Sequence, residues 1–302
     1  MDALRISATA NGQNYLPEYV ADAAGLFEKA GLTVVARAKD PWTGVLDDLV
    51  SGEADLALGG IWVPGMLYGA EPRLTVVCQL NHQFPMAIVL REDIPAFDLA
   101  QLRGMTILAP GAGGSAPYAF TAGLIREQGI DPRDVTFIRD LSTRMLLDMY
   151  RAGTGDGIIL DLTSAAQLQA AGGGTIVFRH LEAGGIMPNS VYYCLADRVD
   201  ELADRISRFS ACIAEAMTRM SADDPVVRAV LAERWPDADQ ELLRSVQAEL
   251  AASQVWASAA FDPAAVGRWM GILADEKMVP TAPAFEDLVD TRFTRDLVAA
   301  RA

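Results

Sequence analysis

The first half of the chain alternates between two hydrophobic patterns. Runs rich in β-branched residues alternate in period two, and the segments between them carry apolar residues at helical spacing. Pro17 suits a first helical turn, and Gly31 suits the position after a helix. The predicted elements are strands at 4–10, 32–38 and 54–60 and helices at 17–31 and 43–52. Strands that alternate with helices indicate a parallel α/β sheet.

The second quarter of the chain repeats the pattern of the first. Segment 145–159 aligns with segment 45–58 at an offset of 101 residues. The identical pairs are Leu46 with Leu147, Asp47 with Asp148, Gly52 with Gly153, and Asp55 with Asp156. Strand-like runs at 105–109, 135–140 and 157–161 follow the same order as those of the first quarter. We therefore expect two βαβαβ units that share one topology.

Two polar crossings separate these units from the rest of the chain. One lies near 81–86 and the other near 184–190, each between strand-like runs. The chain is expected to leave one lobe and return to it, with lobe 1 at 1–85, lobe 2 at 86–189, and the return with the C-terminal helices at 190–302. Predicted helices of this last third are 198–220, 224–235, 239–252, 262–278 and 285–301.

Composition excludes several classes of protein. The formal net charge of −15 argues against a nucleic-acid partner, because phosphate binding needs clustered Lys and Arg. No uninterrupted apolar stretch reaches about 18 residues, so we expect no membrane span. The start "MDALRISATANG" lacks a signal peptide, so we expect a cytoplasmic protein as written, or a periplasmic or extracellular one if a signal was removed. The three cysteines without C-x-x-C spacing and the two histidines predict no metal site.

The stretch 110–117, "PGAGGSAP", lies between a strand-like and a helix-like run. Gly111, Gly113 and Ala116 fit G-x-G-x-x-G/A, the fingerprint of a dinucleotide-binding loop. The acidic residue that should bind the ribose would be Asp140, but it lies 29 residues past Gly111, where about 20 is usual. A helix N-terminus that holds a polar or acidic group is the alternative, and a dinucleotide oxidoreductase is the least favoured reading.

The ordered motifs of the chain resemble one family of binding proteins. Segment 17–32 reads P-x-x-V-A-x-x-x-G-L-F-E-x-A-G-L, and "LVSGEADLAL", "DLAQLRGMTILAPGAGGSAPY", "YRAGTGDGIILDLTSAAQL" and "EDLVDTRFTRDLV" follow in order. This set resembles substrate-binding proteins of the sulfonate, taurine, nitrate and thiamine-pyrimidine-precursor type. The resemblance implies a two-lobed α/β fold of the periplasmic-binding-protein type II, with two crossing hinge segments and a helical C-terminal third. It further implies a ligand in the cleft and closure by a hinge motion.

Candidate ligand-binding residues lie on loops that follow strand ends, where open α/β sheets bind their ligands. In the first lobe they are Asn11, Gln13, Asn14, Tyr15, Trp42, Thr43, Gly60, Trp62, His82 and Gln83. In the second lobe they are Gly113, Gly114, Ser115, Asp140 and Asp161. The aromatic rings among them favour an aromatic or heteroaromatic ligand, and the helix after Ser115 suits an acidic group. Thr43 is also a candidate cap of the helix that follows it.

The resemblance leaves two functions open. The first is a cleft-type binding protein for a small organic molecule, with an ABC permease as partner if the chain is exported. The alternative is a cytoplasmic enzyme on the same scaffold, a lyase, decarboxylase or pyrimidine-synthase-like enzyme, with His82 and Asp161 in acid–base roles. We expect no cofactor. Pyridoxal phosphate would need a lysine in the cleft for a Schiff base, and of Lys29, Lys39 and Lys277 only Lys39 is placed for that role. The first turn, 10–16, holds no cysteine nucleophile of the desulfinase kind.

Overall fold

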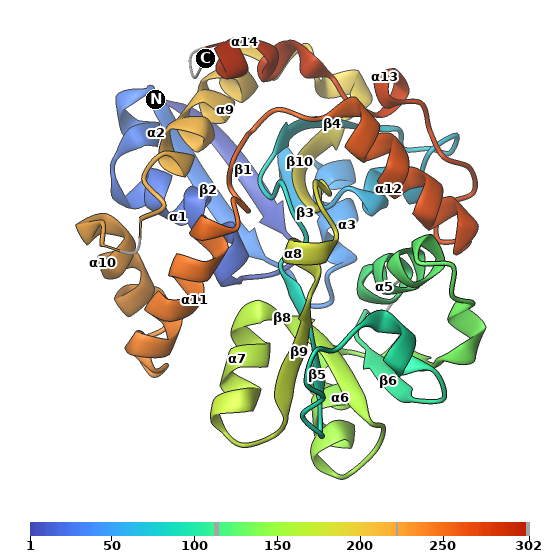
Figure 1. Ribbon diagram of the computed structural model, residues 1–302. Coiled ribbons are helices and arrows are strands. Elements are labelled where there is room, and N and C mark those ends of the chain that lie inside the picture. Colours follow the sequence, from blue (N-terminus) through green and yellow to red (C-terminus); the bar gives the residue numbers. More distant parts are fainter. Residues whose placement is uncertain (112–114, 222, 300–302) are drawn as a thin grey trace. The chain divides into compact units, whose positions relative to one another are not determined.

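The computed structural model describes residues 1–111, 115–221 and 223–299 (Figure 1). The chain divides into two compact units. Unit 1 comprises Met1–Phe84, Ile186–Gly271 and Val279–Ala302, and unit 2 comprises Pro85–Gly185 and Ile272–Met278. The sequence placed the lobe boundaries at 85/86 and 189/190, and its pattern did not indicate that a short C-terminal segment packs with the second unit.

Unit 1 is built on a five-stranded mixed sheet in the order β2-β1-β3-β10-β4 (Figure 1). Its strands are β1 (Asp2–Ala8), β2 (Leu32–Ala38), β3 (Leu56–Gly60), β4 (Leu74–Gln79) and β10 (Ser190–Leu195). Strand β1 runs parallel to both β2 and β3, whereas β10 runs antiparallel to β3 and β4. The strand that returns from the second crossing therefore fills the place between β3 and β4.

Unit 2 repeats this arrangement in the order β7-β6-β8-β5-β9. Its strands are β5 (Met86–Leu90), β6 (Thr106–Ala109), β7 (Thr136–Arg139), β8 (Gly157–Asp161) and β9 (Thr175–Arg179). Here β6 runs parallel to β7 and β8, and β5 runs antiparallel to β8 and β9. Each sheet thus takes its antiparallel strand from the segment that follows a crossing.

A matching pair of aspartates confirms the predicted repeat. Asp55 accepts a hydrogen bond from the backbone N–H of Arg5 at 3.0 Å, and Asp156 accepts one from the N–H of Thr106 at 2.7 Å. Each aspartate also donates its own N–H to the carbonyl of the same partner, at 2.8 Å in both units. The four residues lie at the offset found in the sequence, so the repeat extends to individual hydrogen bonds.

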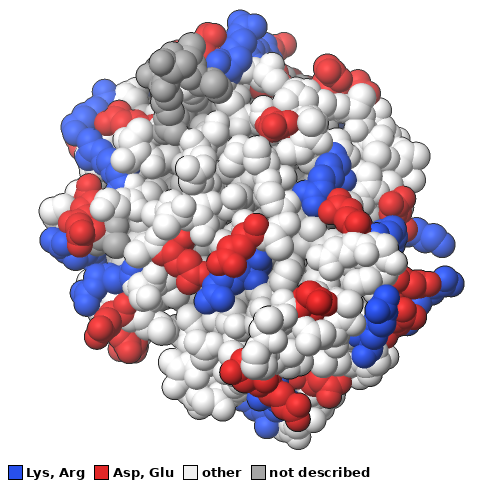
Figure 2. Space-filling view, in the orientation of Figure 1, with Lys and Arg blue, Asp and Glu red and all other residues white. Residues whose placement is uncertain are grey.

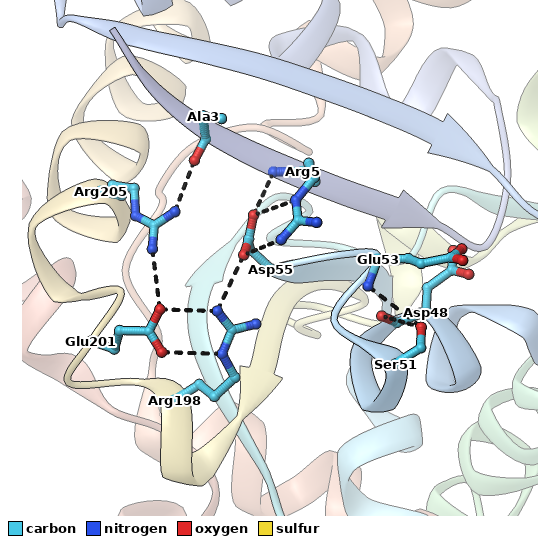
Figure 3. Close-up of polar contacts among 9 residues, drawn as sticks. All are labelled: Ala3, Arg5, Asp48, Ser51, Glu53, Asp55, Arg198, Glu201 and Arg205. Atoms are coloured by element: carbon cyan, nitrogen blue, oxygen red, sulfur yellow. Dashed lines mark hydrogen bonds and ion pairs between the residues drawn. The ribbon is translucent and has the colours of Figure 1, made fainter.

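Asp55 is also the centre of a charged network in unit 1 (Figure 3). Its side chain, 1% exposed, pairs with Arg5 at 2.9 Å and with Arg198 at 3.4 Å. Arg198 and Arg205 both pair with Glu201, at 3.1 and 3.6 Å. The network joins β1 and β3 to the start of the C-terminal helices, which sequence pattern alone did not predict.

Helices of unit 1 flank its sheet and form most of the C-terminal third. They are α1 (Leu16–Ala23), α2 (Leu26–Lys29), α3 (Gly44–Ser51), α4 (Trp62–Met66), α9 (Ala203–Met217), α10 (Pro225–Arg234), α11 (Gln240–Ala252), α12 (Pro263–Asp275, which ends in unit 2), α13 (Phe285–Leu288) and α14 (Arg295–Ala299). The 3-10 turns are η1 (Gln13–Tyr15), η4 (Ala196–Arg198) and η5 (Thr291–Phe293).

Two helices that the sequence predicted as continuous in unit 1 are interrupted in the structure, so these predictions were wrong. The helix expected at 17–31 breaks at Gly25, whose φ of 67° lies in the left-handed region that glycine tolerates. The helix expected at 285–301 is divided into α13, η5 and α14, because Asp290 accepts a hydrogen bond from the Arg292 N–H and starts a new turn.

Unit 2 carries α5 (Ala116–Glu127), α6 (Thr143–Arg151), α7 (Leu162–Ala170) and α8 (His180–Ala183), with η2 (Leu99–Leu102) and η3 (Pro132–Asp134) as connectors. Side chains at the starts of the three longer helices cap them. On the face shown in Figure 2, acidic and basic side chains are interspersed among neutral ones.

The core of unit 1 contains the buried carboxyl group of Glu18, whose hydrogen bond comes from a hydroxyl and not from a cation. Glu18, on α1, is 3% exposed and accepts a hydrogen bond of 2.8 Å from the hydroxyl of Tyr192 on β10. Burial raises the pKa of Glu18 to about 7, against the opposing effects of the Tyr192 hydrogen bond and the charge of Arg234. The rings of Tyr192 and Phe209 pack edge to face with centroids 4.8 Å apart, which joins β10 to α9.

Candidate functional site

The carboxyl ends of several strands lie at one edge of the unit 1 sheet, together with the amino end of β10. This arrangement follows from the parallel direction of β1, β2 and β3 and the antiparallel pairing of β10 with β3 and β4. Open α/β sheets bind ligands outside such an edge. We therefore define the strand-end site as the loops of unit 1 at 9–15, 39–43, 60–62, 79–83 and 189–190.

The loop after β1 is fixed through the backbone carbonyl of Asn14. This oxygen accepts hydrogen bonds from Nδ2 of Asn81 at 2.8 Å and from the indole N–H of Trp256 at 3.0 Å. Nδ2 of Asn14 lies 3.5 Å from Oδ1 of Asn81. Two segments far from this loop in sequence therefore hold it in one conformation.

Other predicted residues of the same loop have different environments. Gln13 is 4% exposed and donates from Nε2 to the carbonyl of Leu243 at 2.7 Å, so it anchors the loop to α11. Tyr15 is buried, with its hydroxyl 3.2 Å from Oγ1 of Thr9. Asn11 is exposed and accepts a hydrogen bond of 2.8 Å from the hydroxyl of Tyr19.

The loop after β2 carries Trp42, which is half-buried, and Thr43, which is exposed. Thr43 takes the cap position of α3, but its side chain forms no capping hydrogen bond, so the expected capping role is wrong. Its backbone angles, φ −60° and ψ −21°, are already helical, whereas a capping side chain needs an extended residue.

Lys39 precedes this loop and is engaged in an ion pair. Its Nζ lies 2.8 Å from Oδ1 of Asp48, whose other oxygen accepts a hydrogen bond of 2.6 Å from Ser7. The hydrogen bond with Asp48 raises the pKa of Lys39. A Schiff-base lysine must lose its proton, so this pairing works against that use of Lys39.

Gly60 and Trp62 form one packed unit after β3. A Cβ atom at Gly60 would lie 1.9 to 2.1 Å from three atoms of the Trp62 ring, so only glycine leaves room for the indole. Trp62 is half-buried and begins α4. Its ring is therefore held against the end of the strand by packing, and it keeps some exposed surface.

The crossing after β4 brings in His82 and Gln83. The backbone of His82 is fixed on both sides, since its N–H donates to Val255 at 2.7 Å and its carbonyl accepts from Met187 at 3.0 Å. Ring Nδ1 lies 3.1 Å from Nε2 of Gln79. Burial lowers the pKa of His82, and the negative charge of Asp262 opposes that shift.

Three residues of the strand-end site, and a fourth residue that contacts it, were not predicted. Asn81 and Gln79 adjoin the predicted crossing, and both are fully buried despite their polar side chains. Asn189 lies in the second crossing, and its buried Oδ1 has no hydrogen-bond partner among the described residues. Trp256 lies in the helical third, where a single tryptophan gives no signal of contact with a loop some 240 positions earlier.

The second-lobe candidates lie in unit 2, and two of them cap helices. Ser115 accepts a hydrogen bond from the N–H of Tyr118 at 3.2 Å and starts α5. Asp161 accepts one from the N–H of Ser164 at 3.0 Å and starts α7. Asp140 is exposed after β7, with a positive φ of 65°. Gly113 and Gly114 lie outside the described residues.

The cysteines and the acidic side chains are further candidates for nucleophiles and metal ligands. Cys78, Cys194 and Cys212 are buried free thiols, and burial raises the pKa of each one. Within residues 1–111, 115–221 and 223–299 there is no cluster of three or more His, Cys, Asp or Glu side chains arranged to hold a metal ion. In that same part of the chain no helix has the length and apolar character that a membrane crossing requires.

Comparisons at the level of sequence find one family and one relative. Residues 12–225 match the family model described as "NMT1/THI5 like". The chain is 27% identical over 241 residues to "Putative binding protein YtlA" of Bacillus subtilis (strain 168), an alignment that covers 76% of this chain and 70% of the relative.

Solved structures confirm the predicted fold class. The periplasmic aliphatic sulphonate binding protein SsuA of Escherichia coli superposes with a TM-score of 0.77 at 15% identity, over 97% of this chain and 99% of that one. The desulfurization enzyme DSZB superposes with a TM-score of 0.66 at 15% identity, over 100% of both chains. Both a binding protein and an enzyme thus share this fold, so the fold alone does not decide the function.

Proposed function

This chain belongs to the NMT1/THI5-like family, as its motifs indicated, and we propose that it binds a small organic molecule that contains a planar ring. In this proposal it acts as the ligand-binding component of an ABC-type import system. The partner would be a permease, and the working location would be outside the cytoplasmic membrane. The Escherichia coli protein described above is a periplasmic binding protein, and a further protein of this fold, from Staphylococcus aureus, is the ligand binding component of an ABC-type import system.

One observation carries the proposal: hydrogen bonds within the protein fix the loops of the strand-end site in unit 1. Asn14 and Asn81 are fixed to each other, and Trp256 holds the same carbonyl from a third segment. A preorganised loop loses little conformational freedom on binding, so more of its interaction energy contributes to affinity. Such an arrangement suits recognition of one ligand shape.

The planar ring is proposed from Trp62. Its indole is held on the Gly60 backbone, so the ring needs no reorganisation to stack on a ligand. An offset stack contributes about 0.5–1.5 kcal/mol beyond the burial of surface. Trp42, half-buried on the neighbouring loop, adds a second ring to the same edge of the sheet.

The charge of the ligand is proposed from the side chains of this site. Those that we assign to the ligand are amides, rings and hydroxyls, and the nearby cation Lys39 is already paired with Asp48. An unpaired anion on the ligand would find no counter-charge in these described loops. We therefore favour a neutral heteroaromatic ring at unit 1 over a sulfonate or nitrate group.

A thermal-shift panel tests the proposal. Aromatic acids, sulfonates, pyrimidines and nitrate-like anions are added one by one, and a binder at about 100 times its Kd should add about 2.7 kcal/mol of stability. Trp62→Ala should lower that gain by about 0.5–1.5 kcal/mol through the lost stack alone. Trp235→Ala removes a half-buried tryptophan outside the strand-end site and should keep it. A panel without any shift in the wild type would count against the proposal.

Hinge closure is a further part of the proposal. The chain passes between the units at 84–85 and 185–186, which we propose as the hinge, and again at 271–272 and 278–279. Ligand binding would shift the population toward a closed form. Small-angle scattering with and without a binder from the panel should show a smaller radius of gyration in its presence, and an unchanged radius would contradict closure.

Binding is favoured over catalysis by His82 with Asp161. The carboxylate of Asp161 is engaged as the cap of α7, and Nδ1 of His82 faces an amide nitrogen. Neither group is placed as a free acid or base. Product analysis after incubation with each panel binder separates the two readings, because a binding protein forms no product. If product forms, His82→Gln tests whether His82 carries the reaction.

A further inference from the structure

The side-chain nitrogen of Gln79 lies within hydrogen-bond distance of two carbonyl oxygens and one ring nitrogen. This residue ends β4 and is fully buried. Its Nε2 lies 2.8 Å from the carbonyl oxygen of Ser258, 3.1 Å from that of Ala260, and 3.1 Å from Nδ1 of His82. Its backbone N–H also donates to Ala259 at 2.9 Å, so the segment around Ala259 is fixed against the end of the strand.

The two carbonyl oxygens determine which way the Gln79 amide points. A carbonyl oxygen only accepts hydrogen bonds, so the amide atom that faces both Ser258 and Ala260 must be the nitrogen. The reverse orientation would place Oε1 against two oxygens. The amide nitrogen has two hydrogens and no acceptor capacity, so a hydrogen bond with Nδ1 of His82 can run only from Gln79, through a hydrogen shared with one of the two carbonyl oxygens.

The orientation of Gln79 in turn determines the protonation of the His82 ring. A neutral imidazole has one protonated and one unprotonated nitrogen, and the nitrogen that faces a donor must be the unprotonated one. We propose that Gln79 holds His82 as the neutral tautomer protonated on Nε2, and that this N–H serves as a hydrogen-bond donor to the ligand. The role of this N–H toward the ligand rests on the proposed function, whereas the tautomer itself does not.

Surrounding groups agree with a neutral ring. An imidazolium would direct a second N–H at the Gln79 nitrogen, and burial also disfavours its charge. Asp262 is the charged group that acts in the opposite direction. None of the described residues forms a hydrogen bond with Nε2 of His82, so this N–H remains available.

The inference narrows what can bind beside His82. The group opposite Nε2 must be an acceptor, such as a ring nitrogen or a carbonyl oxygen, and a ligand donor at that place would be rejected. A general base cannot act through Nε2 either, because this nitrogen already carries the proton. Gln79 is then a positioning residue that acts on the ligand through His82.

Nitrogen NMR on histidine-labelled protein tests the tautomer directly. The chain has two histidines, and the buried His180, with Nε2 2.7 Å from Oγ1 of Thr121, provides an internal reference. His82→Asn assigns the signals. At pH 7 the free wild-type protein should show His82 protonated on Nε2 alone. A ring protonated on Nδ1, or on both nitrogens, would overturn the inference.

Two substitutions test whether Gln79 is the cause. Gln79→Met removes the donor, and the Nδ1-protonated tautomer of His82 should increase by about tenfold, as expected for one hydrogen bond of about 1.4 kcal/mol. Gln79→Glu places an acceptor opposite Nδ1 and should shift the proton there. Unchanged His82 signals in both folded variants would refute the positioning role, and if neither folds, the wild-type spectrum still decides the tautomer.

The outcome is independent of the ligand panel. If NMR shows the predicted tautomer but no panel compound binds, the proposed function alone is contradicted. If a panel compound binds but His82 is the other tautomer, this inference alone is contradicted.

Discussion

The buried carboxyl of Glu18 gives the most quantitative prediction. Glu18→Gln replaces an ionisable group with a neutral one of nearly the same shape, and the amide oxygen can still accept from Tyr192. Because burial raises the pKa of Glu18 to about 7, from 4.5 for an unperturbed glutamate, the folded protein holds this proton where the unfolded chain has lost it.

The sign and size follow from that pKa difference. Below about pH 4.5 both states are protonated, and the stability that Glu18 contributes is fully present. As the pH rises toward 7 the unfolded chain loses its proton first, so folding becomes progressively less favourable. The loss amounts to about 3 kcal/mol at pH 8, since each pKa unit corresponds to about 1.4 kcal/mol. The glutamine variant has no such loss.

Urea unfolding followed by tryptophan fluorescence provides the assay. The five tryptophans are at 42, 62, 235, 256 and 269, all in unit 1, so the signal reports on the unit that contains Glu18. The difference in unfolding free energy between variant and wild type should move by about 3 kcal/mol in favour of the variant between pH 4.5 and pH 8. Comparison of two pH values cancels the pH-independent effects of the substitution.

A pH-independent difference would refute the reasoning, because it would mean that Glu18 ionises as readily in the folded state as in the unfolded one. Tyr192→Phe provides a second check. It removes the hydrogen bond that favours the charged carboxylate, so the loss of stability of this variant should extend to higher pH than in the wild type.

Two further predictions use matched positions. Asp55→Asn should destabilise the protein by about 1–3 kcal/mol, because the new amide nitrogen would face the donors of the arginine partners. Asp156→Asn keeps an acceptor for its single backbone donor and should cost under about 1 kcal/mol. Denaturation followed by circular dichroism measures both values. Equal effects at the two positions would contradict the charged network. Gly60→Ala should displace the Trp62 ring, lower stability by about 1–3 kcal/mol and weaken any panel binder, whereas Gly271→Ala, where a methyl group meets nothing within 4 Å, should be neutral or stabilising.

Much of the fold could be predicted from the sequence because local patterns carry it. Alternating strands and helices indicated the α/β class, and the spacing of Asp55 and Asp156 revealed a repeat whose hydrogen bonds are the same in both units. The break at Gly25 was missed, since glycine is tolerated within an apolar helical pattern until its φ is known.

The candidate site divides in the same way. Loops after strands could be identified from the sequence because parallel strands present their carboxyl ends at a common edge. The roles of side chains within those loops could not. Gln13 follows the same strand as Asn14, yet it donates to a helix carbonyl more than 200 residues later, a contact that leaves no local pattern.

The sequence by itself determined the class of fold and the repeat, and it predicted the crossings and the candidate ligand-binding loops, because hydrophobic period and turn residues act over short distances along the chain. Tertiary structure alone decided that Trp256 and Asn81 fix one carbonyl of the first loop, that Gly60 makes room for Trp62, and that Gln79 faces His82. Those contacts join residues brought together only by folding. A donor and its acceptor must lie close together in space, but they can be any number of residues apart in the sequence. No local pattern therefore predicts their contact.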